Sequence, residues 1–188
     1  MEDWVYRALA KWPNVPAVFG WMGLDRRGRW LIRGEIISRP QIIDTINRNY
    51  AADEQGRWFF QNGPQRGYVT LAYAPLILRI SGDGQLQTHT GLVVERASAA
   101  FLDEHGALAL STEHGAGVLD DQDLNWALER LETNGRVVDE QELTEALSVT
   151  SGELTTLRLR LDGHDLGVTR VDAAELPLHL GFVREPVG

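Results

Sequence analysis

The fold is decided in the stretch Trp21-Met22-Gly23-Leu24-Asp25-Arg26-Arg27-Gly28-Arg29-Trp30-Leu31-Ile32. Asp25 can accept hydrogen bonds from the backbone of its own turn, and Gly28 can adopt the left-handed conformation that closes a hairpin. The apolar residues on either side of this Asp-x-x-Gly turn are typical of β-strands. The sequence therefore predicts a hairpin with strands at residues 18–24 and 29–37.

A capped helix is predicted directly after the hairpin. Ser38-Arg39-Pro40-Gln41 has the Ser-x-x-Gln form of a capping box, and proline is tolerated in the first turn because no intrahelical N–H is lost there. The residues that share one helical face are apolar, namely Ile42, Ile43, Ile46 and Tyr50. We therefore expect a helix from about residue 40 to residue 50.

A second copy of this unit is predicted further along the chain. Asp103-Glu104-His105-Gly106 repeats the first turn 78 residues later, and the turn at Gly163 follows that at Gly84 by 79 residues. Between them, Asp120 and Asp139 are expected to cap two short helices, the first carrying Leu124, Leu128 and Leu131. These patterns predict an α+β fold with two related hairpin-helix-strand units in tandem, mainly antiparallel sheet with few helices.

The charge changes sign along the chain, which suggests three segments. We expect an N-terminal docking helix at residues 1–16, a basic unit at residues 17–94 and an acidic unit at residues 95–188. Residues 1–94 carry 11 Arg or Lys against 8 Asp or Glu, whereas residues 95–188 carry 7 against 19. Such an asymmetry can direct an anion towards the first unit.

Composition narrows the class of protein. The chain has 188 residues, 43% of them hydrophobic, so it can bury a core without disulfides, and it contains no cysteine. No apolar run approaches the roughly 18 residues of a spanning helix, and the acidic start Met1-Glu2-Asp3 does not resemble a secretory signal. We expect a cytoplasmic protein that avoids membranes and, at a net charge of −9, nucleic acid. A homo-oligomer is left open.

Three short motifs resemble a known family. They are Gly23-Leu24-Asp25-x-x-Gly28-x-Trp30, Gly34-x-Ile36 before the isoleucine-rich helix, and Tyr73-Ala74-Pro75-Leu76. Together they resemble the uncharacterised bacterial family catalogued as domain of unknown function 1285, over about half of the chain. Tyr73 and Leu76 stand where that family has an acidic and an aromatic residue. The resemblance implies a two-part α+β protein, suspected of binding a ligand or of regulation, with no established catalysis and no catalytic residue to carry over.

The usual signatures of catalysis and of metal binding are absent from the sequence. It has no nucleophile elbow, Walker loop or dinucleotide-binding glycine motif, which lowers the odds of an enzyme without excluding one. The five histidines form no metal-binding spacing with one another or with a carboxylate. We expect no catalytic residue, no metal and no cofactor.

Arginines alternate with aromatic residues in the first unit, and this pattern can be interpreted in two ways. Guanidinium groups and aromatic faces can together bind an anion. The candidate ligand-binding residues are Arg26, Arg27, Arg29, Trp30, Arg33 and Arg57. The structural alternative, which we favour, is that neighbouring residues on a strand point to opposite faces, so that Trp30 and Ile32 enter the core while Arg29 and Arg33 stay in water.

Three functions remain open at this point. The first is a non-enzymatic module that binds a small ligand, for which an anion is the candidate, or that regulates a partner. The second is an enzyme that acts on a small anionic substrate through arginines of the first unit and carboxylates of the second. The third is a structural protein-interaction module. A pocket containing both arginine and carboxylate groups would favour the second, and a flat apolar patch the third.

Overall fold

The computed structural model describes residues 3, 7, 17–161 and 163–188. The expected docking helix at residues 1–16 therefore lies almost wholly outside the described residues. The chain divides into two compact units, residues 1–75 together with 181–188, and residues 76–180. Among the described residues, no helix is both long enough and apolar enough to cross a membrane.

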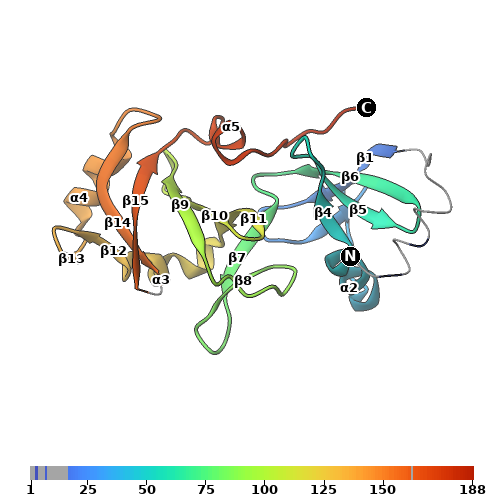
Figure 1. The fold of residues 1–188 in the computed structure, drawn as a ribbon, viewed down its shortest axis with the longest axis horizontal. Coiled ribbons are helices and arrows are strands. Elements are labelled where there is room, and N and C mark those ends of the chain that lie inside the picture. The colour runs from blue at the N-terminus through green and yellow to red at the C-terminus, as the bar shows by residue number, and fades with distance from the viewer. Residues whose placement is uncertain (1–2, 4–6, 8–16, 162) are drawn as a thin grey trace. The chain divides into compact units, whose positions relative to one another are not determined.

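The first unit contains a six-stranded sheet in the order β3-β2-β1-β6-β5-β4 (Figure 1). Its elements are β1 (Ala17–Leu24), β2 (Trp30–Ile32), β3 (Glu35–Ile36), α2 (Pro40–Arg48), β4 (Tyr50–Ala52), β5 (Trp58–Asn62) and β6 (Gln65–Leu71). β1 and β6 are parallel, and the other neighbours are antiparallel. The predicted first hairpin is confirmed, since Leu24 pairs with Trp30 and Met22 with Ile32. The strand expected at residues 29–37 is wrong in its length, because the chain reverses at Arg33 and Gly34, which have positive φ, and returns as β3.

The turn of this hairpin has the predicted geometry. Asp25 Oδ1 accepts hydrogen bonds from the backbone N–H groups of Arg27 at 2.9 Å and Arg29 at 2.8 Å. Gly28 has a φ of 68°, in the left-handed region. Asp53 and Asp103 accept equivalent pairs of backbone hydrogen bonds in two later turns. One local device therefore closes three hairpins.

Helix α2 packs through Ile46, but its ends differ from the prediction. Its N-cap is Arg39, which makes no side-chain capping bond, so the expected capping box at Ser38 does not form. Proline at the first helical position presets φ and has no N–H group that needs a cap. This helix therefore begins without a side-chain cap. Tyr50 does not end the helix but begins β4, where it pairs with Phe60.

The second unit contains a nine-stranded sheet in the order β13-β12-β14-β15-β9-β10-β11-β7-β8. Its strands are β7 (Leu76–Ile80), β8 (Leu86–Thr88), β9 (Ala97–Leu102), β10 (Leu108–Thr112), β11 (Gly115–Leu119), β12 (Leu131–Thr133), β13 (Arg136–Val137), β14 (Leu154–Leu161) and β15 (His164–Arg170). Its helices are η1 (Asp121–Asp123), α3 (Leu124–Leu128), α4 (Glu140–Leu147) and α5 (Leu176–Leu180). The α+β class with mainly antiparallel strands is confirmed.

Two of the predicted helix caps form in this unit. Asp120 accepts a hydrogen bond from Gln122 N, and Asp139 and Glu142 make a capping box. The helix expected to carry Leu124, Leu128 and Leu131 is shorter than predicted. It ends at Leu128, which is 38% exposed, and Leu131 begins β12. The buried residue of α3 is Ala127, since the helix is too short to form a leucine face.

Six strands of the second sheet follow the order of the first. In the run β11-β10-β9-β15-β14-β12 the one parallel contact joins β9 to β15, as β1 joins β6 in the run β3-β2-β1-β6-β5-β4. α3 also follows β11 in the chain as α2 follows β3. The correspondence concerns topology, and duplication of the chain stays a prediction.

The boundary between the units falls at Pro75, earlier than the expected change at residue 94. The hairpin of β7 and β8 joins the second sheet because β7 pairs in parallel with β11, with Ile77 beside Val118. The last residues return to the first unit, where Leu71 N donates to Arg184 O at 2.8 Å. The boundaries of the two units are set by pairing between strands that are far apart in the sequence. The charge of a segment does not predict such pairing.

Replacing Gly28 tests the turn that closes the first hairpin. We expect Gly28→Val to lower the free energy of unfolding by about 1 to 3 kcal/mol, because a β-branched residue resists a positive φ. The control is Gly82→Ala, since Gly82 has no positive φ and open space around its α-carbon. Urea unfolding measures both variants. Equal midpoints for Gly28→Val and the wild type would contradict the prediction.

Candidate functional site

The candidate site lies in the second unit, where strands β9 and β15 separate. These parallel strands pair only from Val168 and Ala100 onward, although β15 begins at His164 and β9 at Ala97. Their amino ends therefore diverge. Two pockets lie there, of about 320 Å³ and 540 Å³, and both are lined by residues Glu95, Arg96, Ala97 and Leu161.

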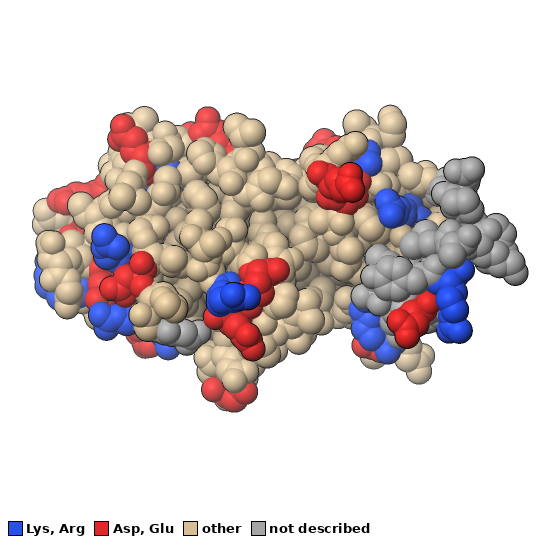
Figure 2. Space-filling model, in the orientation of Figure 1, with Lys and Arg blue, Asp and Glu red and all other residues tan. Residues whose placement is uncertain are grey.

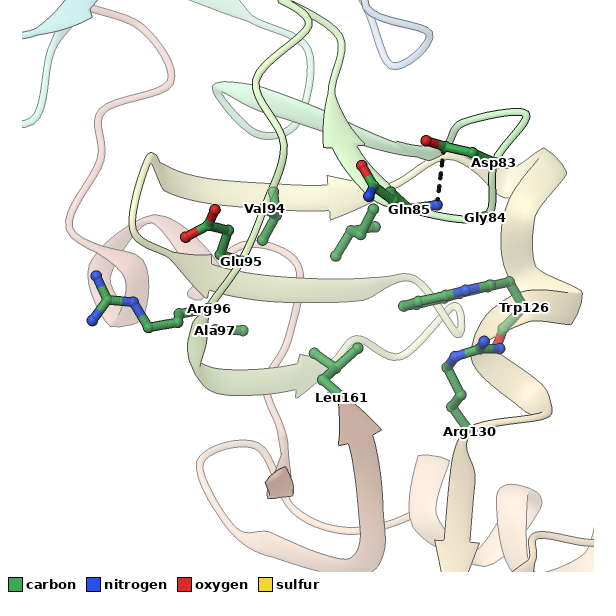
Figure 3. A pocket seen from close by; sticks show the side chains of 11 residues that line it. Asp83, Gly84, Gln85, Val94, Glu95, Arg96, Ala97, Trp126, Arg130 and Leu161 are labelled. Atoms are coloured by element: carbon green, nitrogen blue, oxygen red, sulfur yellow. Dashed lines mark hydrogen bonds between the residues drawn. The ribbon is translucent and has the colours of Figure 1, made fainter. Parts of the chain in front are cut away.

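The smaller pocket, which we call the tryptophan pocket, combines an apolar lining with charges of both signs. Its apolar side chains include Leu86, Val94, Leu161 and the ring of Trp126. Its charged residues are Asp83, Glu95, Arg96 and Arg130. Figure 3 shows Trp126 and Arg130 at one end, Glu95 and Arg96 at the other, and Leu161 between the two ends.

Trp126 and Arg130 form a pair four residues apart, Trp126 in α3 and Arg130 in the turn that follows the helix. The Arg130 guanidinium carbon lies 4.4 Å from the centre of the Trp126 ring, and Nη1 donates to Trp126 O at 3.0 Å. Glu129 Oε2 lies 3.8 Å from the same nitrogen. The indole N–H of Trp126 is buried and has no hydrogen-bond partner among the described residues. A buried, unpaired donor thus lies beside a stacked guanidinium at the pocket.

Glu113 holds the strand that forms the far end of the pocket. Its Oε1 accepts hydrogen bonds from Glu95 N at 2.6 Å and from Arg96 N at 3.1 Å. Burial alone would raise the pKa of the Glu113 carboxyl, but these backbone hydrogen bonds outweigh burial and lower the pKa. Glu113 is therefore an ionised support for the segment that carries Glu95 and Arg96.

The larger pocket, which we call the notch pocket, lies between the diverging strand ends. Arg96, Ser98 and Glu113 line it together with His164 and Asp165. Asp165 Oδ1 lies 3.6 Å from Arg160 Nε, so the Asp165 carboxylate already has a cationic neighbour. Among the described residues, no group of three or more His, Asp and Glu side chains is arranged to hold a metal ion.

The arginines predicted from the sequence contact partners within the first unit. Arg29 Nε lies 2.6 Å from Asp25 Oδ2, and Arg57 Nη2 lies 2.8 Å from Asp53 Oδ2. The guanidinium groups of Arg26 and Arg33 stack on Tyr73 at 4.3 Å and on Trp21 at 4.0 Å. Arg27 is exposed on the same turn as Arg26. Anion binding by these arginines stays a prediction.

Trp30 belongs to the core, as the structural alternative requires. It is 1% exposed, and its Nε1 donates to Asn47 Oδ1 at 2.8 Å, which ties the sheet to α2. A side chain so buried cannot stack on a ligand. The structural alternative also placed Ile32 in the core, and this part of it is wrong because Ile32 is 43% exposed.

Sequence reasoning missed Trp126 and Arg130. Their spacing of four residues was a signal, since residues at i and i+4 on a helix are neighbours and tryptophan is a favoured partner for arginine. The partners of this pair come from residues 83–97 and from Leu161, which only the tertiary structure brings together.

Charge is dispersed over the surface. Figure 2 shows charged side chains of both signs in small groups separated by uncharged surface, so the described residues make no continuous basic surface on this face. The second unit carries 7 Arg and 19 Asp or Glu. A long polyanion finds no extended docking surface on the face shown.

The fold defines a class of two-unit α+β proteins. A family model described as "Protein of unknown function (DUF2946)" matches residues 1–187, and the chain therefore belongs to that family, DUF2944. No curated protein matches the sequence.

Two solved structures are similar to this chain to different extents. A DUF1285 family protein from Silicibacter pomeroyi DSS-3 matches with a TM-score of 0.55 and 16% identity, covering 87% of this chain and 86% of its own. A DUF1285 family protein from Shewanella baltica OS155 has a TM-score of 0.43 and 15% identity, covering 56% of this chain and 89% of its own. The resemblance predicted from the sequence is confirmed at the level of the fold.

Glu113→Gln tests the support of the pocket strand. We expect it to lower the free energy of unfolding at neutral pH by about 1 kcal/mol, because a charged acceptor is lost. The pKa of Glu113 is lowered in the folded protein, so its contribution is full above the ordinary glutamate pKa and is lost as the pH falls through the folded-state value. The difference between the two proteins should therefore vanish in acid.

The matched control for this test is Glu153→Gln. Glu153 is exposed, and its side chain has no hydrogen bond or ion pair among the described residues. Urea titrations at several pH values compare the three proteins. If Glu113→Gln shows no larger loss than Glu153→Gln at neutral pH, Glu113 does not hold the strand.

Proposed function

We propose that this protein is a small-ligand-binding or regulatory module rather than an enzyme, and that its ligand carries an anionic group bound in the tryptophan pocket. The observation that carries the proposal is the indole N–H of Trp126, buried at the pocket without a hydrogen-bond partner among the described residues. A buried donor left unpaired costs roughly 1 to 3 kcal/mol. A ligand oxygen that accepts from it removes this cost.

Arg130 supplies the second half of the anion site. Among the described residues, only its Nη1 has partners, namely Trp126 O and Glu129, so the rest of the guanidinium fork is available. Arginine binds carboxylate and phosphate groups in a forked manner, and its stacking on Trp126 presets the orientation of the fork. A carboxylate or phosphate can therefore accept from Trp126 and Arg130 together.

The size and lining of the pocket support binding of a small molecule. A volume of about 320 Å³ lies at the lower end of the roughly 300 to 1,000 Å³ typical of such sites. Leu86 and Val94 are 7% and 6% exposed and provide an apolar wall. Acids outside the pocket act weakly beyond a Debye length of about 8 Å, whereas Asp83 and Glu95 belong to its lining.

The hydrogen bonds of nearby acids favour binding over catalysis. Asp83 accepts hydrogen bonds from the Ser81 hydroxyl and from Gln85 N, and these bonds lower the pKa of its carboxyl. Glu113 is engaged by backbone N–H groups. Both carboxylates thus serve the local structure, and neither is a free general base.

A thermal-shift panel of nucleotides and small organic acids tests the proposal. At a concentration of about 100 times Kd, a ligand should add about 2.7 kcal/mol to the free energy of unfolding, and the melting temperature should rise visibly. Trp126→Phe, which keeps a ring but loses the donor, and Arg130→Gln should each remove most of the shift. Circular dichroism confirms that both variants fold.

Two control variants locate the site. Arg158→Gln makes the same change of charge at an exposed residue of β14, and it should respond as the wild type does. The triple variant Arg26→Gln, Arg27→Gln, Arg29→Gln should also respond. Loss of the shift only in the triple variant would move the site to the first unit. The absence of any shift in the wild type would overturn the proposal.

A further inference from the structure

The notch pocket contains two open strand edges. At their amino ends, β9 and β15 share their last register pair at Ala100 and Val168, yet β9 begins at Ala97 and β15 at His164. Figure 1 shows the two strands moving apart towards these ends. Within the described chain, no register pair joins residues 97–98 to residues 164–166. The edges that these residues turn towards each other are therefore open.

Both open stretches keep the extended conformation because each has a strand on its other side. β9 pairs with β10 as far as Ala97, which lies opposite Thr112. β15 pairs with β14 as far as His164, which lies opposite Leu161. Backbone N–H and C=O groups on an open edge are a template for another extended chain. A peptide that adds a strand to a sheet obtains its affinity from hydrogen bonds to such groups.

The side chains beside the open edges leave room for a peptide backbone. The notch pocket has a volume of about 540 Å³. Ala97 and Ser98 are small, and the Ser98 hydroxyl donates to Ser111 O at 3.3 Å, on the side of β10. β15 offers the longer open edge, at residues 164–166. An added strand is therefore expected to pair with β15.

The charges of the notch pocket favour a basic partner. Its titratable lining residues are Glu95, Arg96, Glu113, His164 and Asp165. With the histidine neutral, three carboxylates stand beside one guanidinium. Arg160 Nε lies near Asp165, but Arg160 Nη1 also lies 2.9 Å from Glu132 Oε1, so this neighbouring pair adds no net charge. The second unit carries 7 Arg and 19 Asp or Glu, and this surplus of acids adds to the attraction for a basic segment.

We propose that the notch pocket binds an extended, basic peptide of a partner protein, which adds a strand to the open edge of β15. Alternate side chains of such a peptide lie on one face of the sheet, so lysines or arginines at every second position share a face. On one of the two faces they can pair with Asp165. This inference is independent of the anion site, because its contacts are the backbone of β15 and the carboxylates of the notch pocket.

An NMR titration of the isotope-labelled full chain with defined peptides tests this inference. The probe is an acetylated and amidated pentapeptide of alternating lysine and valine. We expect saturable shifts of the backbone amide signals of residues 97–98 and 164–166, larger than the shift of the Trp126 indole signal.

Two control peptides separate strand pairing from charge. One is a copy of the probe with every backbone nitrogen methylated, which keeps the lysines but has no backbone donors. The other has glutamate in place of lysine, which keeps the backbone but reverses the charge. We expect each control to bind at least about tenfold more weakly than the probe.

Asp165→Lys tests the position of the site. The Asp165 side chain is 50% exposed, and Arg160 keeps Glu132 as a partner, so the variant should fold, which circular dichroism checks. We expect it to bind the basic probe about tenfold more weakly, because like charges then face each other. The control Glu153→Lys makes the same reversal next to the opposite end of β14, and its affinity should stay within about twofold of the wild type, since charges beyond a Debye length are screened.

Three results would overturn the inference. The first is the absence of shifts at residues 97–98 and 164–166 with the basic probe. The second is equal affinity for the methylated copy, for the glutamate copy, or of the Asp165→Lys variant for the probe. The third is a change of the same signals with protein concentration alone, which would make a second copy of the chain the occupant. Anion binding at the tryptophan pocket is decided separately by the thermal-shift panel.

Discussion

The hydrogen bonds from backbone N–H groups to a turn aspartate are the interaction on which the rest of the fold depends. At Asp25, Asp53 and Asp103 one carboxylate oxygen accepts from two backbone groups, and a glycine three residues on adopts a positive φ. Such a turn sets the register of its hairpin, and register decides which side chains face the core. Trp30 is buried and hydrogen-bonded to α2 because of the register set at Asp25.

A second constraint, the parallel contact of β9 with β15, creates the candidate site. The strands pair at their carboxyl ends and separate at their amino ends, so they cannot fill the space between residues 95–98 and 164–166 with their own hydrogen bonds. Glu113 stabilises the open edge by accepting from Glu95 and Arg96. The pockets are thus a consequence of topology, and α3 completes the smaller one with Trp126.

Electrostatics assigns different roles to the two units. In the first, carboxylates and aromatic faces engage arginines, as at Arg57, which contacts both Asp53 and Tyr68. In the second, acids exceed arginines, yet in the part of the chain that the structure describes Arg130 keeps part of its guanidinium unused beside a buried donor. The net charge of a unit therefore does not describe the charges at one pocket, because interactions there depend on the nearest groups.

The sequence by itself determined the local structure of this protein. The Asp-x-x-Gly turns, the first hairpin, the cap at Asp139 and the α+β class follow from residues close together in the chain, whose interactions are short in range. Three features depend on tertiary structure alone. The β7–β8 hairpin belongs to the second sheet, residues 181–188 return to the first unit, and the residues of the tryptophan pocket come together. These features join segments far apart in sequence through strand pairing, for which neither charge nor hydrophobic period carries a signal. The spacing of Trp126 and Arg130 was a local signal, but the other residues of their pocket come from distant segments of the chain.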